Sequence, residues 1–141
     1  MLNPGGSIKD RTAISILEQG LKSGAITEDT VIVESSSGNM GIGLAQACSF
    51  YGLRLICVVD AKTTTQNIHI LKAYGAQIDY VSEPDPVTGE YLQARIDRVE
   101  YLLKIVKNSF WPNQYANLHN PRAHLTTMRE IVAEVDRMIA A

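Results

Sequence analysis

Lys9 raises the first chemical question in this sequence. It lies in the run Asn3-Pro4-Gly5-Gly6-Ser7-Ile8-Lys9-Asp10-Arg11, where the spacing Ser7-x-x-Asp10 predicts a capping box that opens a helix. Lys9 would then occupy the first helical turn, where the positive end of the helix dipole disfavours an ammonium group. One reading is a surface lysine whose amine extends to solvent. The other is a neutral, nucleophilic amine of the kind that forms Schiff bases.

A second candidate site is the polar run Ser35-Ser36-Ser37-Gly38-Asn39-Met40-Gly41. It joins an apolar, strand-like segment to a helix, so backbone N–H groups, serine hydroxyls and the helix dipole converge there. Such a loop suits a carboxylate or phosphate, although serine and asparagine also cap helices without any ligand. Gly41 and Gly43 would lie inside the helix, where each glycine costs about 1 kcal/mol. Either close packing or close approach of a ligand would explain them.

Gln114 is the third polar candidate. Its amide could bind a polar ligand group, but the residue could equally belong to a turn.

Cys48 and Cys57 lie in apolar segments and are expected to be buried core residues. The three histidines have no zinc-ligand spacing, and the glycine spacing fits neither a dinucleotide fingerprint nor a P-loop. We therefore predict no metal site.

Strand and helix patterns alternate along the chain and would position these residues. Apolar residues at helical spacing predict helices, and short continuous apolar runs predict buried strands. The expected helices cover residues 9–22, 40–51, 65–74, 91–107 and 121–133, the last with Asn120 as N-cap. The expected strands cover residues 31–33, 54–59, 77–81 and 110–112, with a further strand beginning at 138–141.

This alternation predicts an α/β fold in which a parallel sheet is covered by helices on both faces. Ligands of such sheets bind beyond the carboxyl ends of the strands. The run from Ser35 to Gly41 follows the first strand directly, so it would lie at that edge. The fold thus predicts a ligand site where the sequence has its serine-rich loop.

Composition excludes several classes of function. The chain has 141 residues, with 13 basic and 15 acidic side chains and a net charge of −2. This balance gives no support for a nucleic-acid or membrane-surface partner. No apolar run is long enough to span a bilayer, and the N-terminus lacks a signal-peptide pattern. We expect a cytoplasmic protein.

Together the motifs resemble those of the fold-type-II pyridoxal-phosphate enzymes, the family of cysteine synthase and cystathionine β-synthase. The run Asn3–Arg11 resembles the family's cofactor-lysine motif, and Ser36–Gly41 resembles its substrate-carboxylate loop. Gln114-Tyr115-Ala116-Asn117 through Asn120-Pro121 resembles its glutamine segment. The motifs occur in the family's order, and the resemblance extends from Asn3 to the end of the chain.

The resemblance implies pyridoxal 5′-phosphate as cofactor, small amino acids as substrates and a homodimeric parent enzyme. Lys9 would bind the cofactor covalently and later remove the substrate α-proton, while Asn39 would hydrogen-bond the cofactor's 3′ oxygen. The expected substrate-binding residues are Ser36, Ser37, Gly38, Asn39, Met40 and Gln114.

Two positions indicate a branch within the family. Cysteine synthases usually carry threonine where this chain has Ser36 and Met40, so the cysteine synthase contact at Met40 cannot be carried over. The loop, Glu83–Gly89 and Phe110–Asn117 instead resemble enzymes that make N-(2-amino-2-carboxyethyl)-L-glutamate for 2,3-diaminopropionate and siderophore synthesis. These enzymes release phosphate from O-phosphoserine and use the amine of glutamate as nucleophile. The alternatives are a cysteine synthase using O-acetylserine and sulfide, and a non-catalytic α/β domain that binds an anion or a partner protein.

The resemblance also implies a domain division. Residues 1–117 would form the family's small domain, and residues 118–141 would begin its large domain. Family members are longer and carry a glycine- and threonine-rich phosphate cup after the strand expected at 138–141. We therefore expect the 141-residue chain alone to bind pyridoxal phosphate poorly and to lack turnover.

Overall fold

A parallel sheet forms the centre of the molecule. The structure is a computed structural model that describes residues 3–4, 6–114, 116 and 119–141, so Gly5, Tyr115 and Asn117 of the sequence motifs lie outside the described residues. Its strands run parallel in the order β3-β2-β1-β4. They are β1 (Val31–Ser35), β2 (Arg54–Asp60), β3 (Gln77–Val81) and β4 (Ser109–Phe110).

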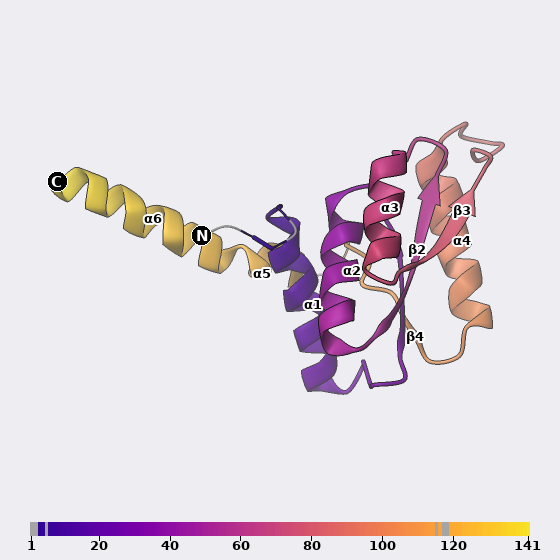
Figure 1. The fold of residues 1–141 in the computed structure, drawn as a ribbon, viewed down its shortest axis with the longest axis horizontal. Coiled ribbons are helices and arrows are strands. Elements are labelled where there is room, and N and C mark those ends of the chain that lie inside the picture. The colour runs from indigo at the N-terminus through magenta and orange to yellow at the C-terminus, as the bar shows by residue number, and fades with distance from the viewer. Residues whose placement is uncertain (1–2, 5, 115, 117–118) are drawn as a thin grey trace.

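Helices cover both faces of this sheet, which confirms the predicted fold class (Figure 1). One face is covered by α1 (Lys9–Ser23), α2 (Asn39–Tyr51) and α3 (Thr65–Ala73), and the other by α4 (Tyr91–Ile105). Strand residues alternate between the two resulting cores. Ile32 belongs to the core beneath α1 and α2, whereas Val31 and Val33 pack with Val99 of α4. This period-two alternation within an apolar strand is what a sheet buried on both faces requires.

The helix boundaries follow the local signals in the sequence. Gly24 and Gly52 end α1 and α2 in the left-handed conformation, with φ of 80° and 70°, which glycine adopts without steric cost. Thr64 caps α3 by accepting a hydrogen bond from the Asn67 N–H. The capping box at α1 was a wrong prediction. The Ser7 hydroxyl accepts from the N–H of Lys9 at 3.2 Å, and Ile8 stands at the N-cap in a helical conformation.

The first strand is longer than predicted. Ser35 pairs with Val58 in the parallel register, so it belongs to β1 rather than to the loop. The loop proper is therefore Ser36–Gly38, and Asn39 is the first residue of α2. The polar run thus spans a strand end, a short turn and a helix start.

The C-terminal prediction was wrong in its boundaries and in its last element. The helix expected at 121–133 is two helices, α5 (His119–Ala123) and α6 (Leu125–Ala140), so Asn120 lies inside α5 and is not an N-cap. The strand expected at 138–141 does not form, because α6 continues through Ala140. The apolar residues at 138–139 extend the helical periodicity of Leu125, Met128 and Val132, which outweighs their short strand-like run.

Strand order defines the edge at which a ligand can bind. From β1 the chain proceeds to β2 and β3 on one side, then returns through α4 to place β4 on the other side of β1. β1 is therefore the point at which the winding direction reverses. Ligands of open parallel sheets bind in the crevice beyond the strand ends at such a point. The segments following β1 and β4 meet there.

Candidate active site

A pocket of about 290 Å³ lies at this crevice. Its volume is near the lower limit of the range for small-molecule sites, about 300 Å³. All the site residues predicted from sequence contribute to it, together with one that was not predicted. The lining residues are Lys9, Ser36, Ser37, Gly38, Asn39, Met40, Arg95 and Gln114.

Lys9 enters this pocket from the first turn of α1. Its side chain is half-buried, and its backbone packs closely on α2. A Cβ placed on Gly43 would lie 3.1 Å from the Lys9 carbonyl oxygen and 3.3 Å from the Asp10 backbone. Gly43 therefore permits the close helix–helix contact that holds Lys9 beside the start of α2, so packing accounts for this helical glycine.

Ser36 organises the start of α2. Its hydroxyl oxygen accepts a hydrogen bond from the Gly41 N–H at 2.8 Å, and its own N–H donates to the Val58 carbonyl. A Cβ on Gly41 would lie 3.1 Å from the Ser36 Cβ and 3.2 Å from the Cys57 sulfur. Ser36 is buried and its polar groups bond to protein, so its position in the pocket wall reflects helix capping.

The next residues of the loop present different surfaces to the pocket. Ser37 is half-buried, and its carbonyl accepts from the Asn67 side-chain amide at 3.1 Å. Asn39 is exposed at the first position of α2, beside N–H groups that helix geometry leaves without partners within the helix. Met40 is 2% exposed and packs in the core beneath α1 and α2. It forms an apolar wall where a threonine would offer a hydroxyl.

Gln114 reaches the pocket from the segment after β4. Its side-chain amide donates to the Ser35 carbonyl at 3.4 Å, and its backbone N–H donates to Glu34 at 3.3 Å. Glu34 is buried within β1, and burial raises the pKa of its carboxyl while hydrogen bonds from Trp111, Ser35 and Gln114 act against that rise. The structure thus places Gln114 beside the serine loop, although the loop precedes Gln114 by 70 or more residues in the chain.

Arg95 is the site residue that sequence reasoning missed. It lies on α4, is 8% exposed, and pairs with Asp60 at the carboxyl end of β2, with Nε 3.0 Å from Oδ2. The signal was available, because Arg95 stands one helical turn before the buried Val99 and so lies on the core-facing stripe. A cation on a buried stripe requires a partner or a ligand.

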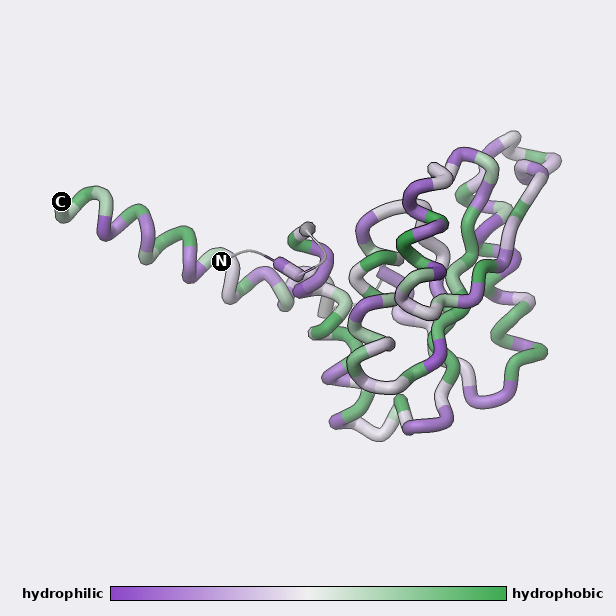
Figure 2. The backbone as a smooth tube through the Cα atoms, viewed as in Figure 1, coloured by the Kyte–Doolittle hydropathy of each residue, from purple (hydrophilic) through white to green (hydrophobic). Residues whose placement is uncertain are grey.

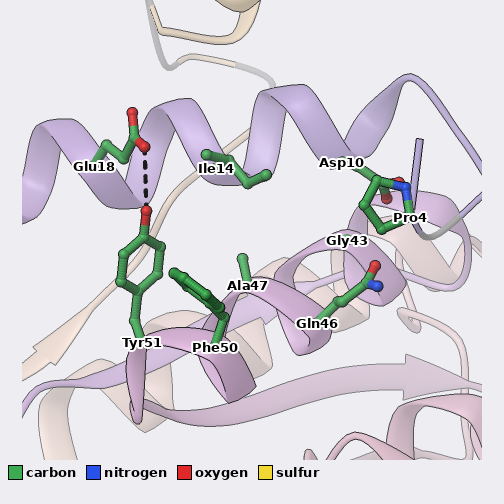
Figure 3. Close-up of a pocket in the computed structure, with 9 residues that line it drawn as sticks. All are labelled: Pro4, Asp10, Ile14, Glu18, Gly43, Gln46, Ala47, Phe50 and Tyr51. Carbon is green, nitrogen blue, oxygen red and sulfur yellow. Dashed lines mark hydrogen bonds between the residues drawn. The ribbon is translucent and has the colours of Figure 1, made fainter. Parts of the chain in front are cut away.

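A second, larger pocket of about 410 Å³ lies between α1 and α2 (Figure 3). Ile14, Ala47 and Phe50 give it an apolar surface, and the Tyr51 hydroxyl donates to Glu18 at its end. Among the described residues, its lining includes no lysine, cysteine or histidine. It therefore offers no amine for Schiff-base chemistry and is not the candidate active site.

Neither cysteine supplies a nucleophile elsewhere. Burial raises the pKa of the Cys48 thiol to about 12 and that of the Cys57 thiol to about 12, with the nearby Glu34 carboxylate also raising the latter. Both thiols are buried, as predicted. No group of three metal-binding side chains occurs among the residues that the structure describes, and none of the described helices is long and apolar enough to cross a membrane.

Comparisons with known proteins identify the family of the chain. A family model described as pyridoxal-phosphate dependent enzyme matches residues 1–141. The chain is 38% identical to a hydrogen sulfide-producing enzyme from Fusobacterium nucleatum, with a TM-score of 0.86 over 95% of this chain and 42% of that one. It is 36% identical to an O-acetylserine-dependent cystathionine β-synthase from Helicobacter pylori, with a TM-score of 0.83 over 94% of this chain and 42% of that one.

A cysteine synthase from Entamoeba histolytica is also similar, at 31% identity and a TM-score of 0.83 over 95% of this chain and 38% of that one. The chain thus spans about two fifths of the length of these solved relatives. Family match and structural similarity both extend over nearly all of its residues. The chain belongs to the family of pyridoxal-phosphate-dependent enzymes.

Proposed function

We propose that this chain carries the lysine and the substrate loop of an enzyme for β-replacement on an activated serine. The donor would be O-phospho-L-serine and the nucleophile the amine of L-glutamate, giving N-(2-amino-2-carboxyethyl)-L-glutamate for 2,3-diaminopropionate and siderophore synthesis. The observation that carries the proposal is one pocket that holds Lys9, the start of α2 and the buried cation Arg95.

The pocket fits the charge of the cofactor and the substrate. Pyridoxal phosphate and phosphoserine are both anionic, and the described lining of the pocket includes two cations and no carboxylate. The N-terminus of α2 adds N–H donors and a positive dipole end. Lys9 would hold the cofactor covalently through Nζ, and Asn39, exposed at the helix start, would hydrogen-bond its 3′ oxygen.

In the reaction, Lys9 would transfer protons and other residues of the pocket would bind the substrate. When bound, pyridoxal phosphate supplies an electron sink for the charge that develops at the substrate Cα. Lys9 would take the α-proton, the Cβ–O bond would break with its electron pair leaving on phosphate, and the glutamate amine would form the new Cβ–N bond. Lys9 would finally return a proton to Cα. Ser37, Gly38 and Gln114 would orient the substrate carboxylate.

Arg95 supports phosphoserine over acetylserine as the donor. A guanidinium binds phosphate through parallel N–H donors, whereas a neutral acetyl group gains little from the same cation. The Asp60 carboxylate, which also accepts from the Lys62 N–H, forms an ion pair with the guanidinium, with Oδ2 3.0 Å from Nε, and Nε has no hydrogen-bond partner among the residues that the structure describes. A buried cation in the pocket wall would stabilise phosphate as it leaves.

The second candidate is a cysteine synthase that uses O-acetylserine and sulfide. Two similar structures support it, since one is described as O-acetylserine dependent and another as a cysteine synthase. Met40 argues against transferring the cysteine synthase contact at this position to the present chain, because Met40 offers an apolar wall in place of a hydroxyl. The homodimeric state, the cytoplasmic location and the division at residue 117 remain predictions from the family resemblance.

Product analysis with the full-length gene product would test the choice of donor. We expect phosphate release from O-phosphoserine with glutamate to exceed acetate release from O-acetylserine with sulfide. Arg95→Met should raise the KM for O-phosphoserine by about ten- to hundredfold, the value of a hydrogen bond to a charged group, and leave that for O-acetylserine nearly unchanged.

Arg98→Met is the matched control, because Arg98 lies on the same helix but pairs with Asp79 outside the pocket. Its KM values should match those of the unmodified enzyme. Preferential use of O-acetylserine, with Arg95→Met affecting both donors equally, would favour the cysteine synthase instead.

A further inference from the structure

The β1–β4 ladder ends early, yet the chain after β4 stays against β1. The last paired residues are Ile32 and Phe110. Pro112 has no N–H to donate, and Asn113 takes a left-handed conformation with φ of 47°, so a regular strand cannot continue there. Something other than the backbone ladder must therefore hold the segment that carries Gln114 into the pocket.

The Glu34 carboxylate supplies these missing contacts. One oxygen, Oε1, accepts from the indole N–H of Trp111 at 2.9 Å and from the Ser35 N–H at 2.8 Å. The other, Oε2, accepts from the Gln114 backbone N–H at 3.3 Å. Glu34 thus bonds the post-β4 segment on both sides of Pro112.

Among side chains of this shape, only a carboxylate can accept all of these hydrogen bonds. All three partners are N–H donors, and an ionised carboxylate offers only acceptors. A glutamine would present its own NH₂ group to at least one of the donors. Glu34 is 1% exposed, so its desolvation must be offset by these hydrogen bonds. An acid in the middle of an apolar strand is a costly choice if its only task is to fill space.

We infer that Glu34 is a positioning residue, which fixes the segment from Trp111 to Gln114 against the carboxyl end of β1 and thereby places the Gln114 amide in the pocket. The inference rests on the proposed function in one respect, that Gln114 meets the substrate carboxylate. Glu34 itself does not line the pocket, so it would act through Gln114.

A double-mutant cycle with the full-length gene product tests this dependence. Glu34→Gln and Gln114→Ala should each raise the KM for the amino-acid donor, by about tenfold for one weakened hydrogen bond to a charged group, with kcat changed less than KM. In the Gln114→Ala background, Glu34→Gln should raise KM little further, because Glu34 would act on the substrate only through the Gln114 side chain, which is then absent.

A second variant keeps the test valid if Glu34→Gln does not fold. Trp111→Phe removes one donor and leaves the carboxylate in place, so it should raise KM in the same direction by a smaller factor. Trp111 is the only tryptophan of the 141-residue sequence, so the emission maximum measured on that chain reports the environment of its indole beside Glu34. Glu34→Gln should shift that maximum. The conservative Glu34→Asp should also show a shifted maximum and a raised KM, because its carboxylate is one methylene too short.

The outcomes separate the inference from the proposed function. If Glu34→Gln left KM unchanged while Gln114→Ala raised it, or if the two effects were independent in the double variant, the positioning role would be overturned and the function of Gln114 left intact. An unchanged KM in Gln114→Ala would overturn both. A shifted Trp111 emission with non-additive KM effects is the result that the inference expects.

Discussion

At the scale of single residues, the site depends on charges that the fold buries. Arg95, Asp60 and Glu34 are all less than 10% exposed, and each lies at or beside the carboxyl ends of the strands. Such groups cost desolvation energy unless they are paired or hydrogen-bonded. The three N–H donors on Glu34 meet that requirement, and Arg95 and Asp60 are paired in charge, although Arg95 Nε has no hydrogen-bond partner among the described residues.

Glu34 should leave a signature in the pH dependence of stability. Burial raises the pKa of its carboxyl above 4.5, so the folded chain retains this proton to a higher pH than the unfolded chain. Between pH 4.5 and the raised folded pKa the native state binds more protons, and the contribution of Glu34 to stability therefore falls as pH rises. Below that window both states are protonated and the contribution is constant.

Urea unfolding of the 141-residue chain and its Glu34→Gln variant across this pH range would measure the effect. The difference between their free energies of unfolding should change with pH in the stated direction. Two curves that stay parallel through the window would show that Glu34 titrates alike in both states.

Some of the residues in and around the site could be predicted from the sequence and others could not, for a physical reason. Lys9, the serine loop and Gln114 lie at element ends, where local spacing already indicates an exposed polar group. Arg95 and Glu34 lie inside apolar stripes of a helix and a strand. Their roles follow from tertiary contacts: Arg95 pairs with Asp60 at the end of β2, and Glu34 bonds the segment after β4, which lies beside β1.

At the scale of elements, the contact between α1 and α2 positions Lys9. The first turn of α1 lies directly on Gly43, where any Cβ would meet backbone atoms at 3.1–3.3 Å. Backbone atoms cannot rotate away as a flexible side chain can. The separation of these two helices therefore sets the distance from Lys9 to the serine loop.

Gly43→Ala should disturb this contact. Alanine gains about 1 kcal/mol in helix propensity, but overpacking against backbone typically costs about 1–3 kcal/mol, so we expect net destabilisation of up to about 2 kcal/mol. Chemical denaturation gives the value, with Ser49→Ala on the exposed side of α2 as a control that changes propensity alone. A Gly43→Ala variant that is more stable than the parent would contradict the close contact.

Most elements could be predicted from the sequence, because buried strands and glycine-capped helices have strong local signals. β3 was predicted at its observed bounds, 77–81, and the helix starts at Lys9 and Tyr91 were correct. The C-terminal segment failed because four apolar residues at its end resemble a strand, while the longer periodicity from Leu125 favours a helix. Local pattern alone did not separate these two interpretations.

At the scale of the whole molecule, α6 stands apart from the sheet and its helices (Figure 1). Arg11 of α1 holds its start, donating to Thr127 at 3.0 Å and to Glu130 at 2.9 Å. Beyond that point α6 extends away, and Figure 2 shows hydrophobic and hydrophilic residues alternating along it. Its large apolar side chains are 46–78% exposed: Leu125, Met128, Ile131, Val132, Val135, Met138 and Ile139.

This exposed apolar surface should make the 141-residue chain associate at high concentration. Sedimentation velocity over a concentration series would measure it. Val132→Lys combined with Val135→Lys should shift the chain toward the monomer. Replacing the exposed polar residues Thr126 by lysine and Asp136 by asparagine adds the same positive charge without removing apolar surface and should have a smaller effect. Equal behaviour of the two double variants would show that α6 does not drive association.

The most direct test of the account is borohydride reduction of the full-length gene product after incubation with pyridoxal phosphate, followed by peptide mapping. We expect a single stable phosphopyridoxyl group on the peptide that contains Lys9, and its loss in Lys9→Ala. Lys62 and Lys72 are exposed and serve as internal controls for non-specific modification. Modification of these lysines to the same extent as Lys9, or its persistence in Lys9→Ala, would contradict the assignment of Lys9 as the cofactor-binding residue.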